Sequence, residues 1–128
     1  MIINYYKVDR ILKIELTEEI DQHTADKIRR VIDDEIERYI PRKVVFDFYN
    51  ITFMDSSGIG MILGRYKLTK LLGGEVIIIN ANKNIKKIFN MSGVTRIIKI
   101  DESKKVKILK EHLKDNIDRE EKKDEGIV

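Results

Sequence analysis

Two hydrophobic patterns follow one another along the chain, and their order predicts an α/β fold. In the run 11–16, apolar residues alternate with Lys13 and Glu15, which is the period of a half-buried strand. An extended apolar run over 2–8 precedes it. The two-residue gap at 9–10 predicts that these strands form an antiparallel hairpin.

The period then changes to steps of three and four residues, which predicts a helix. Asp21 is suited to cap its start, and Pro41, the single proline, follows as a stop. The apolar, β-branched run 43–48 predicts a buried strand. The apolar face of the helix comprises Ile28, Val31, Ile32, Ile36, Tyr39 and Ile40.

The second half of the chain repeats this alternation. A helix is expected from Ser56–Ser57 to Gly73–Gly74, where glycine supplies the left-handed residue of a helix end. The further elements expected are a buried strand over 75–80, a short helix over 84–93, an edge strand over 95–100 and a last helix through Val106, Leu109 and Leu113. The order predicts a mixed sheet of four to five strands flanked by about four helices.

Composition narrows the class of protein. The 128 residues suit one domain, expected over 1–116, with a charged tail over 117–128 that we expect to be frayed or disordered. The net charge of +3 comes without a basic stripe, which disfavours direct nucleic-acid binding. There is no cysteine, no visible signal peptide and no apolar run long enough to span a membrane. These features predict a soluble, cytoplasmic protein.

The stretch "FMDSSGIGMILGRYK" (53–67) is a candidate functional turn between a strand and a helix. Unpaired N–H groups and a partial positive charge at a helix start suit a phosphate, either on a ligand or attached to a serine. Gly58 and Gly60 would permit close approach and strained backbone angles. The simpler interpretation is that Asp55 or Ser56 only caps the helix.

Other phosphate-binding and catalytic motifs fit the turn poorly. The glycines space as GxGxxxG, the Gly-Lys-Ser/Thr of a Walker loop is missing, and Gly-x-Ser-x-Gly does not occur. His23 and His112 are expected at the surface, so a serine nucleophile has no convincing base. A nucleotide- or small-anion-binding module stays open, and a serine hydrolase is the weakest alternative.

Three segments in register resemble one family. "FMDSSGIGMILGRYK" is similar to the signature of the bacterial anti-sigma factor antagonists, which are STAS domains. "LTEEIDQHTA" (16–25) resembles their second motif, although Glu18 replaces the usual glycine, and "IFNMSGVTRIIKI" (88–100) resembles the third. "ILGRYK" with "FNMSG" is most similar to the branch that controls sigma-F in sporulating bacteria. Three motifs are more specific than one.

The resemblance implies a regulatory binding protein rather than an enzyme, without a cofactor or a metal. The first serine of Asp-Ser-Ser-Gly, here Ser56, would be phosphorylated by the anti-sigma factor, which is a serine kinase. Only the unphosphorylated form would bind that kinase and release the sigma factor, and a phosphoserine phosphatase would reset the switch. The partner face implied by the motifs comprises Asp21, His23, Thr24, Asp55, Ser57, Gly58, Gly60 and Arg65.

Several of these residues also have a simpler structural interpretation. Asp21 and Ser57 would serve as helix caps, and Gly60 and Gly64 would allow close packing against the sheet. Arg65 and Lys67 would form a solvated face, with salt-sensitive contact to the kinase as the functional alternative. The apolar side chains of Phe53, Met54 and Met91 are expected in the core, and Met91 has an interface role as its alternative.

Overall fold

The computed structural model describes residues 1–101 and the backbone of 121–123. Strands β1 (Ile2–Tyr6) and β2 (Ile11–Glu15) form the predicted antiparallel hairpin. They are followed by α1 (Gln22–Tyr39), β3 (Lys43–Asp47), α2 (Ser56–Leu71), β4 (Glu75–Ile79) and α3 (Lys83–Ser92). A 3-10 turn (Val94–Arg96), β5 (Lys99–Ile100) and β6 (Glu121–Lys123) complete the described elements.

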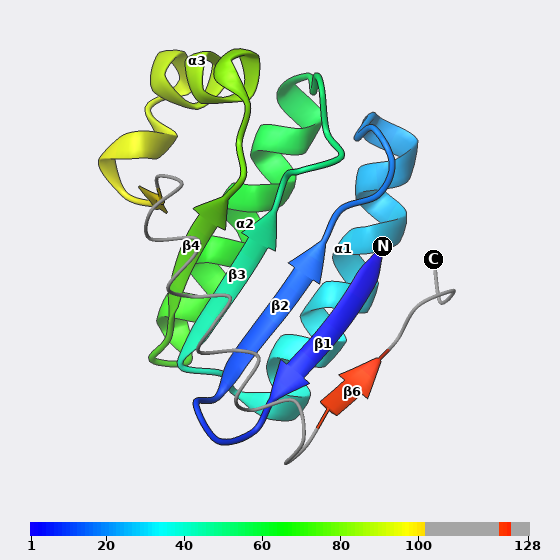
Figure 1. Ribbon diagram of the computed structural model, residues 1–128, viewed down its shortest axis with the longest axis vertical. Coiled ribbons are helices and arrows are strands. Elements are labelled where there is room, and N and C mark those ends of the chain that lie inside the picture. Colours follow the sequence, from blue (N-terminus) through cyan, green and yellow to red (C-terminus); the bar gives the residue numbers. More distant parts are fainter. Residues whose placement is uncertain (102–120, 124–128) are drawn as a thin grey trace.

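The strands form one mixed sheet in the order β5-β4-β3-β2-β1-β6, drawn in Figure 1. β2, β3, β4 and β5 are mutually parallel, and β1 runs antiparallel to both of its neighbours. The parallel pairs are joined through α1, α2 and α3, which are the crossover connections such pairs require. The expected class, a mixed sheet with flanking helices, is confirmed.

Helices α1 and α2 lie on the same side of the sheet, behind it in Figure 1. The main core between these layers is built on fully buried side chains such as Leu12, Ile32, Phe46 and Ile62. A second buried cluster comprises Tyr6, Ile11, Val45, Ile77 and Ile79. Because neighbouring side chains of a strand point to opposite faces, β3 and β4 contribute to both clusters. Burial on both faces explains why these strands are continuous apolar runs.

The helix ends follow the local sequence. Gly73 (φ +90°) and Gly93 (φ +82°) adopt the left-handed conformation after α2 and α3, as the sequence predicts. Helix α1 ends at Tyr39, and Ile40 takes the left-handed conformation itself (φ 43°) before the buried Pro41. Arg10 (φ 56°) does the same in the β1–β2 turn.

The segment 95–100 is not the strand that its composition predicts. Val94 and Ile98 are buried, whereas Thr95, Arg96 and Ile97 between them are exposed. A spacing of four between buried residues is the period of a helical turn, so a 3-10 turn forms and the strand shrinks to β5. The helix expected through Val106, Leu109 and Leu113 lies outside the described residues. Of the predicted tail over 117–128, only β6 is described.

Candidate functional site

Three helix starts gather at one end of the sheet, because α1, α2 and α3 each follow the carboxyl end of a parallel strand (Figure 1). Each start is capped by its own Asx side chain. Oδ1 of Asp21 accepts from Thr24 N at 2.8 Å, Oδ1 of Asp55 from Ser57 N at 2.8 Å, and Oδ1 of Asn82 from Ile85 N at 2.9 Å. The capping role predicted for Asp21 is therefore confirmed, and at α2 the cap is Asp55 rather than Ser56.

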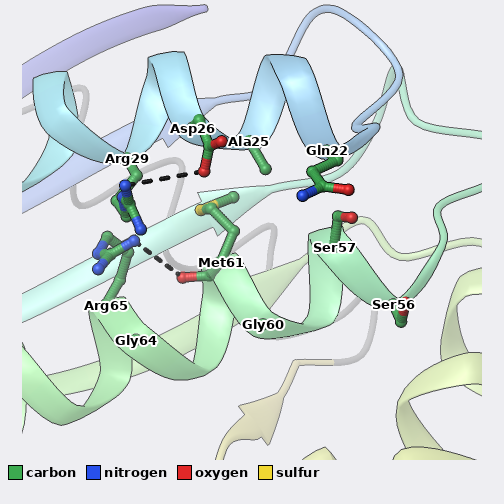
Figure 2. A pocket seen from close by; sticks show the side chains of 10 residues that line it. All are labelled: Gln22, Ala25, Asp26, Arg29, Ser56, Ser57, Gly60, Met61, Gly64 and Arg65. Carbon is green, nitrogen blue, oxygen red and sulfur yellow. Dashed lines mark hydrogen bonds and ion pairs between the residues drawn. The ribbon is translucent and has the colours of Figure 1, made fainter.

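Ser56 and Ser57 occupy the first turn of α2 but face different surroundings. Ser56 is the first residue of the helix, is exposed and lies at the end of the groove between α1 and α2, and Figure 2 shows its side chain directed away from Gln22. The half-buried Ser57 instead points toward Gln22 of α1. The Ser56 hydroxyl is therefore open to solvent at the start of α2, where the partial positive charge of the helix dipole favours a phosphate group.

The loops that precede α1 and α2 converge. Ile20 pairs with Met54 in an isolated parallel bridge, and the next residues along the chain are the two caps, Asp21 and Asp55. Their carboxylates consequently lie at the same edge as Ser56. Hydrogen bonds from Thr24 and the charge of His23 lower the pKa of Asp21 despite slight desolvation.

Glu19 joins the β2–α1 loop to the β3–α2 loop by hydrogen bonds, a role that was not predicted from the sequence. Its Oε1 accepts from Thr52 N at 3.0 Å and from Thr52 Oγ1 at 2.9 Å, and its Oε2 accepts from Phe53 N at 3.2 Å. Desolvation acts to raise the pKa of Glu19, but the hydrogen bonds from Thr52 and Phe53 outweigh it and lower the pKa. The sequence indicated only that Glu19 belongs to the second family motif, and it did not indicate which residues Glu19 would bind. The neighbouring Glu18 lacks a positive φ, so the loop forms without the glycine usual in the family.

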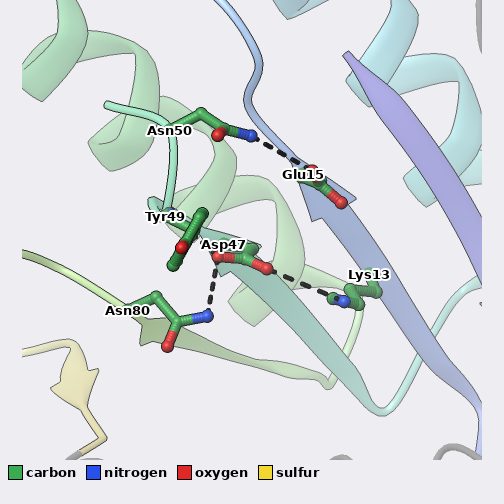
Figure 3. Close-up of polar contacts among 6 residues, drawn as sticks. All are labelled: Lys13, Glu15, Asp47, Tyr49, Asn50 and Asn80. Carbon is green, nitrogen blue, oxygen red and sulfur yellow. Dashed lines mark hydrogen bonds and ion pairs between the residues drawn. The ribbon is translucent and has the colours of Figure 1, made fainter. Parts of the chain in front are cut away.

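The beginning of the β3–α2 loop is anchored by polar contacts that Figure 3 shows. The buried carboxylate of Asp47 accepts from Tyr49 N at 2.9 Å and from Asn80 Nδ2 at 3.0 Å, and Lys13 Nζ lies 3.7 Å from its Oδ2. Asn50 Nδ2 donates to Glu15 Oε2 at 3.2 Å. These contacts hold residues 47–50, which precede the part of the loop that Glu19 binds.

A groove of about 480 Å³ runs between α1 and α2 (Figure 2). Its lining includes Arg29, Ser57, Gly60 and Arg65. Arg29 lies 3.7 Å from the carboxylate of Asp26, and Arg65 is paired with Asp33. Each of these arginines already has a carboxylate beside it, so an anion in the groove would compete with Asp26 and Asp33.

Arg65 was expected on a solvated face, and that expectation is wrong. The residue is 7% exposed, its Nε lies 2.6 Å from Asp33 Oδ1, and its Nη1 donates to Met61 O at 3.3 Å. Desolvation lowers the pKa of Arg65 and raises that of Asp33, against the attraction between them. Arg65 links α2 to α1, because the helices bring Asp33 opposite it. Lys67 is exposed as expected.

The glycines of α2 match their predicted roles only in part. Neither Gly58 nor Gly60 has a positive φ, so the strained angles expected for them are absent. A Cβ at Gly58 would lie 2.9 Å from Met54 Sδ, which confirms the close approach there. A Cβ at Gly60 or Gly64 would meet nothing within 4 Å, so these residues line the groove instead of packing against the sheet.

The apolar residues around the turn divide between core and surface. Met54 is 2% exposed, as predicted. Phe53 is 62% exposed and Met91 79% exposed, so their predicted core positions are wrong. The core positions in these segments are taken by Ile51, Met54 and Phe89.

The described residues offer neither a metal site nor a membrane span. Among the described residues, no cluster of three or more histidine and acidic side chains is placed to hold a metal ion. Within the same part of the chain, no helix combines the length and apolar character needed to cross a bilayer.

Comparison with known proteins identifies the family of this arrangement. The model of the STAS domain matches residues 3–106. The anti-sigma F factor antagonist of Paenibacillus polymyxa is 40% identical over 90 residues, which are 70% of this chain and 77% of that protein. The anti-sigma factor antagonist SpoIIAA in its unphosphorylated form superposes with a TM-score of 0.66 at 28% identity, over 77% of this chain and 85% of that one. The Bacillus cell fate determinant SpoIIAA in the phosphorylated form gives 0.60 at 28% identity, over 77% and 88%.

Proposed function

The chain belongs to the STAS domain family, among the anti-sigma factor antagonists, and on this premise we propose that it is a partner-switching regulator controlled at Ser56. The unphosphorylated form binds an anti-sigma factor that is also a serine kinase, and so frees a sigma factor. Phosphorylation of Ser56 ends this binding, and a phosphoserine phosphatase restores it. The chain is a substrate and a ligand in this cycle, not a catalyst, and it acts in the cytoplasm without direct contact to nucleic acid.

The exposure of Ser56 at the first position of α2 is the observation that carries the proposal. A transferase must reach the hydroxyl oxygen, and Ser56 is exposed to solvent at the open end of the groove. A relative of 28% identity is known as a structure in the phosphorylated form, which supports the same chemistry in this fold.

Electrostatics explain why a phosphate would act as a switch. It adds a charge of about −1.5 to −2 near neutral pH. The start of α2 stabilises part of this charge, by about 0.3–1 kcal/mol at an exposed site. The exposed carboxylates of Asp55 and Asp21 at the same edge oppose it by like-charge repulsion, which salt and solvent screen.

Phosphorylation should affect the binding of the partner more than the folding of this domain. The α2 start sits on well-packed elements, so the modified domain stays folded. A partner shaped to cover a neutral hydroxyl must instead accommodate a desolvated phosphate among its own packed or acidic groups. Such a mismatch costs several kcal/mol, which corresponds to a loss of affinity of a hundredfold or more.

Incubation with the purified anti-sigma factor kinase of the same organism and ATP tests the proposal. We expect one phosphate per chain, mapped to Ser56 by mass spectrometry and absent from Ser56→Ala. Ser57→Ala is the matched control, because this neighbouring hydroxyl points into the groove and its loss should leave phosphorylation intact. Phosphate on Ser57 instead, or none on the wild-type chain, would overturn the assignment.

Nucleotide or small-anion binding by the chain itself is the alternative from another functional class. The groove beside Ser57 has the volume for a small ligand, but Arg29 and Arg65 are both paired within the protein. Tight binding of nucleotide without any partner protein would favour this alternative. The reaction with kinase separates the two.

A further inference from the structure

We propose that Phe53 is an apolar anchor for the anti-sigma factor kinase, used both when the kinase binds this chain and when it phosphorylates Ser56. This inference rests on the proposed function and specifies the chemistry of its partner. The partner would carry an apolar pocket next to its phosphoryl-transfer site.

The loop leaves no room for Phe53 in the core. Ile51 is fully buried and Met54 is 2% exposed, so the apolar positions on either side of Phe53 are already packed. Phe53 itself is 62% exposed. A single exposed apolar side chain is ordinary on a protein surface, so exposure alone assigns no function. The informative feature is that its backbone is immobilised while its ring stays in solvent.

Contacts from both sides immobilise this backbone. On the α1 side, Glu19 accepts hydrogen bonds from the amides of Thr52 and Phe53. On the α3 side, Asn82 Nδ2 donates to Ile51 O at 3.0 Å, and Met54 pairs with Ile20 immediately afterwards. An anchor presented on a fixed backbone loses little conformational entropy on binding, which is the property of efficient interface residues. Aromatic side chains in such positions dominate many interfaces.

Proximity to Ser56 identifies the partner. Ser56 follows Phe53 by three positions, which limits the distance between their Cα atoms to about 10 Å. A kinase that encloses the Ser56 hydroxyl must therefore also cover or approach the ring of Phe53. The ring is next to the point where phosphate is added, so contact through Phe53 and repulsion by phosphate act on the same patch.

The test compares Phe53→Ala with Leu71→Ala. Leu71 is 81% exposed and lies at the last position of α2, about 22 Å along the helix from Ser56, so it controls for the loss of an exposed apolar side chain. Binding of each unphosphorylated variant to the purified kinase is measured by calorimetry, and phosphorylation is measured by initial rates. Folding of both variants is checked by thermal unfolding.

We expect Phe53→Ala to weaken binding by about tenfold to thirtyfold and to raise KM for phosphorylation with kcat little changed. Phe53→Leu should restore most of the affinity, and Leu71→Ala should match wild type. Equal affinity of Phe53→Ala and wild type, with Ser56→Asp still defective, would overturn the role of Phe53 and leave the proposed function standing. Failure of the wild-type chain itself to bind the kinase would overturn both.

Discussion

Glu19 and Thr52, which are 33 residues apart in the chain, are joined by two hydrogen bonds to one carboxylate oxygen. Oε1 of Glu19 accepts from the backbone N and from Oγ1 of Thr52, at 3.0 Å and 2.9 Å. The other oxygen accepts from Phe53 N. One exposed side chain of the β2–α1 loop thereby fixes the middle of the loop that carries the proposed phosphorylation site.

Replacing Glu19 by alanine should release this loop. The amides of Thr52 and Phe53 lose their acceptor, so we expect their hydrogen exchange to accelerate and the protein to lose about 1 kcal/mol of stability. Glu18→Ala removes the adjacent exposed carboxylate and is the matched control. If both variants exchange at the wild-type rate at Thr52 and Phe53, the loop is held by other contacts.

The carboxylates of Glu19 and Asp21 should make the stability of the protein depend on pH in the acid range. The pKa values of Glu19 and Asp21 are lowered in the folded protein, so both carboxylates bind protons more weakly there than in the unfolded chain. Their contribution to stability is therefore complete above the ordinary values of 4.5 and 3.8, and it is lost as the pH falls through the lower folded-state values. An NMR titration of the Thr52, Phe53 and Thr24 amides should report midpoints below those values. Midpoints at or above them would contradict the prediction.

Arg65 should act on stability rather than on partner binding. Removing it leaves Asp33, a half-buried carboxylate, without its cation, so Arg65→Ala should cost about 2–3 kcal/mol in chemical denaturation. Arg65→Lys should recover only part of this, because an ammonium cannot reproduce the separate contacts of Nε and Nη1. Lys67→Ala is the exposed control. A large loss of kinase affinity in Arg65→Lys with little loss of stability would restore the partner contact expected from the sequence.

Replacing Gly60 and Gly74 by alanine should change the stability of the protein in opposite directions. At Gly60 an added Cβ meets nothing within 4 Å in a helix interior, so Gly60→Ala should stabilise the protein by about 0.5–1 kcal/mol. At Gly74 it would lie 2.5 Å from the backbone oxygen of Pro41, so Gly74→Ala should destabilise by about 1–3 kcal/mol. Denaturant midpoints of the two variants measure both effects. Destabilisation by Gly60→Ala would mean that the α1–α2 groove is narrower than in this structure.

Phosphorylation should change surface charge without unfolding the domain. We expect Ser56→Ala to bind the kinase constitutively and Ser56→Asp to bind poorly, as pull-down experiments would show. The amide spectra of the phosphorylated and free forms should differ only over 20–25 and 53–66. Equal binding by the two variants would refute the charge mechanism, and a general loss of chemical-shift dispersion would indicate unfolding instead.

Features governed by neighbouring residues were predictable. The hairpin, the helices α1 to α3 and the caps Asp21 and Asp55 follow from local periodicity and from the chemistry of helix starts.

Features that depend on residues distant in the chain could not be predicted from the sequence. Local spacing treats Arg65 as a surface cation and Phe53 as a core residue, and both expectations failed because α1 supplies Asp33 and because Ile51 and Met54 already occupy the core. The sequence by itself thus determined the order of the elements and the serine at the start of α2. Only the tertiary structure decided which side chains surround that serine, because burial and pairing depend on segments that folding alone brings together.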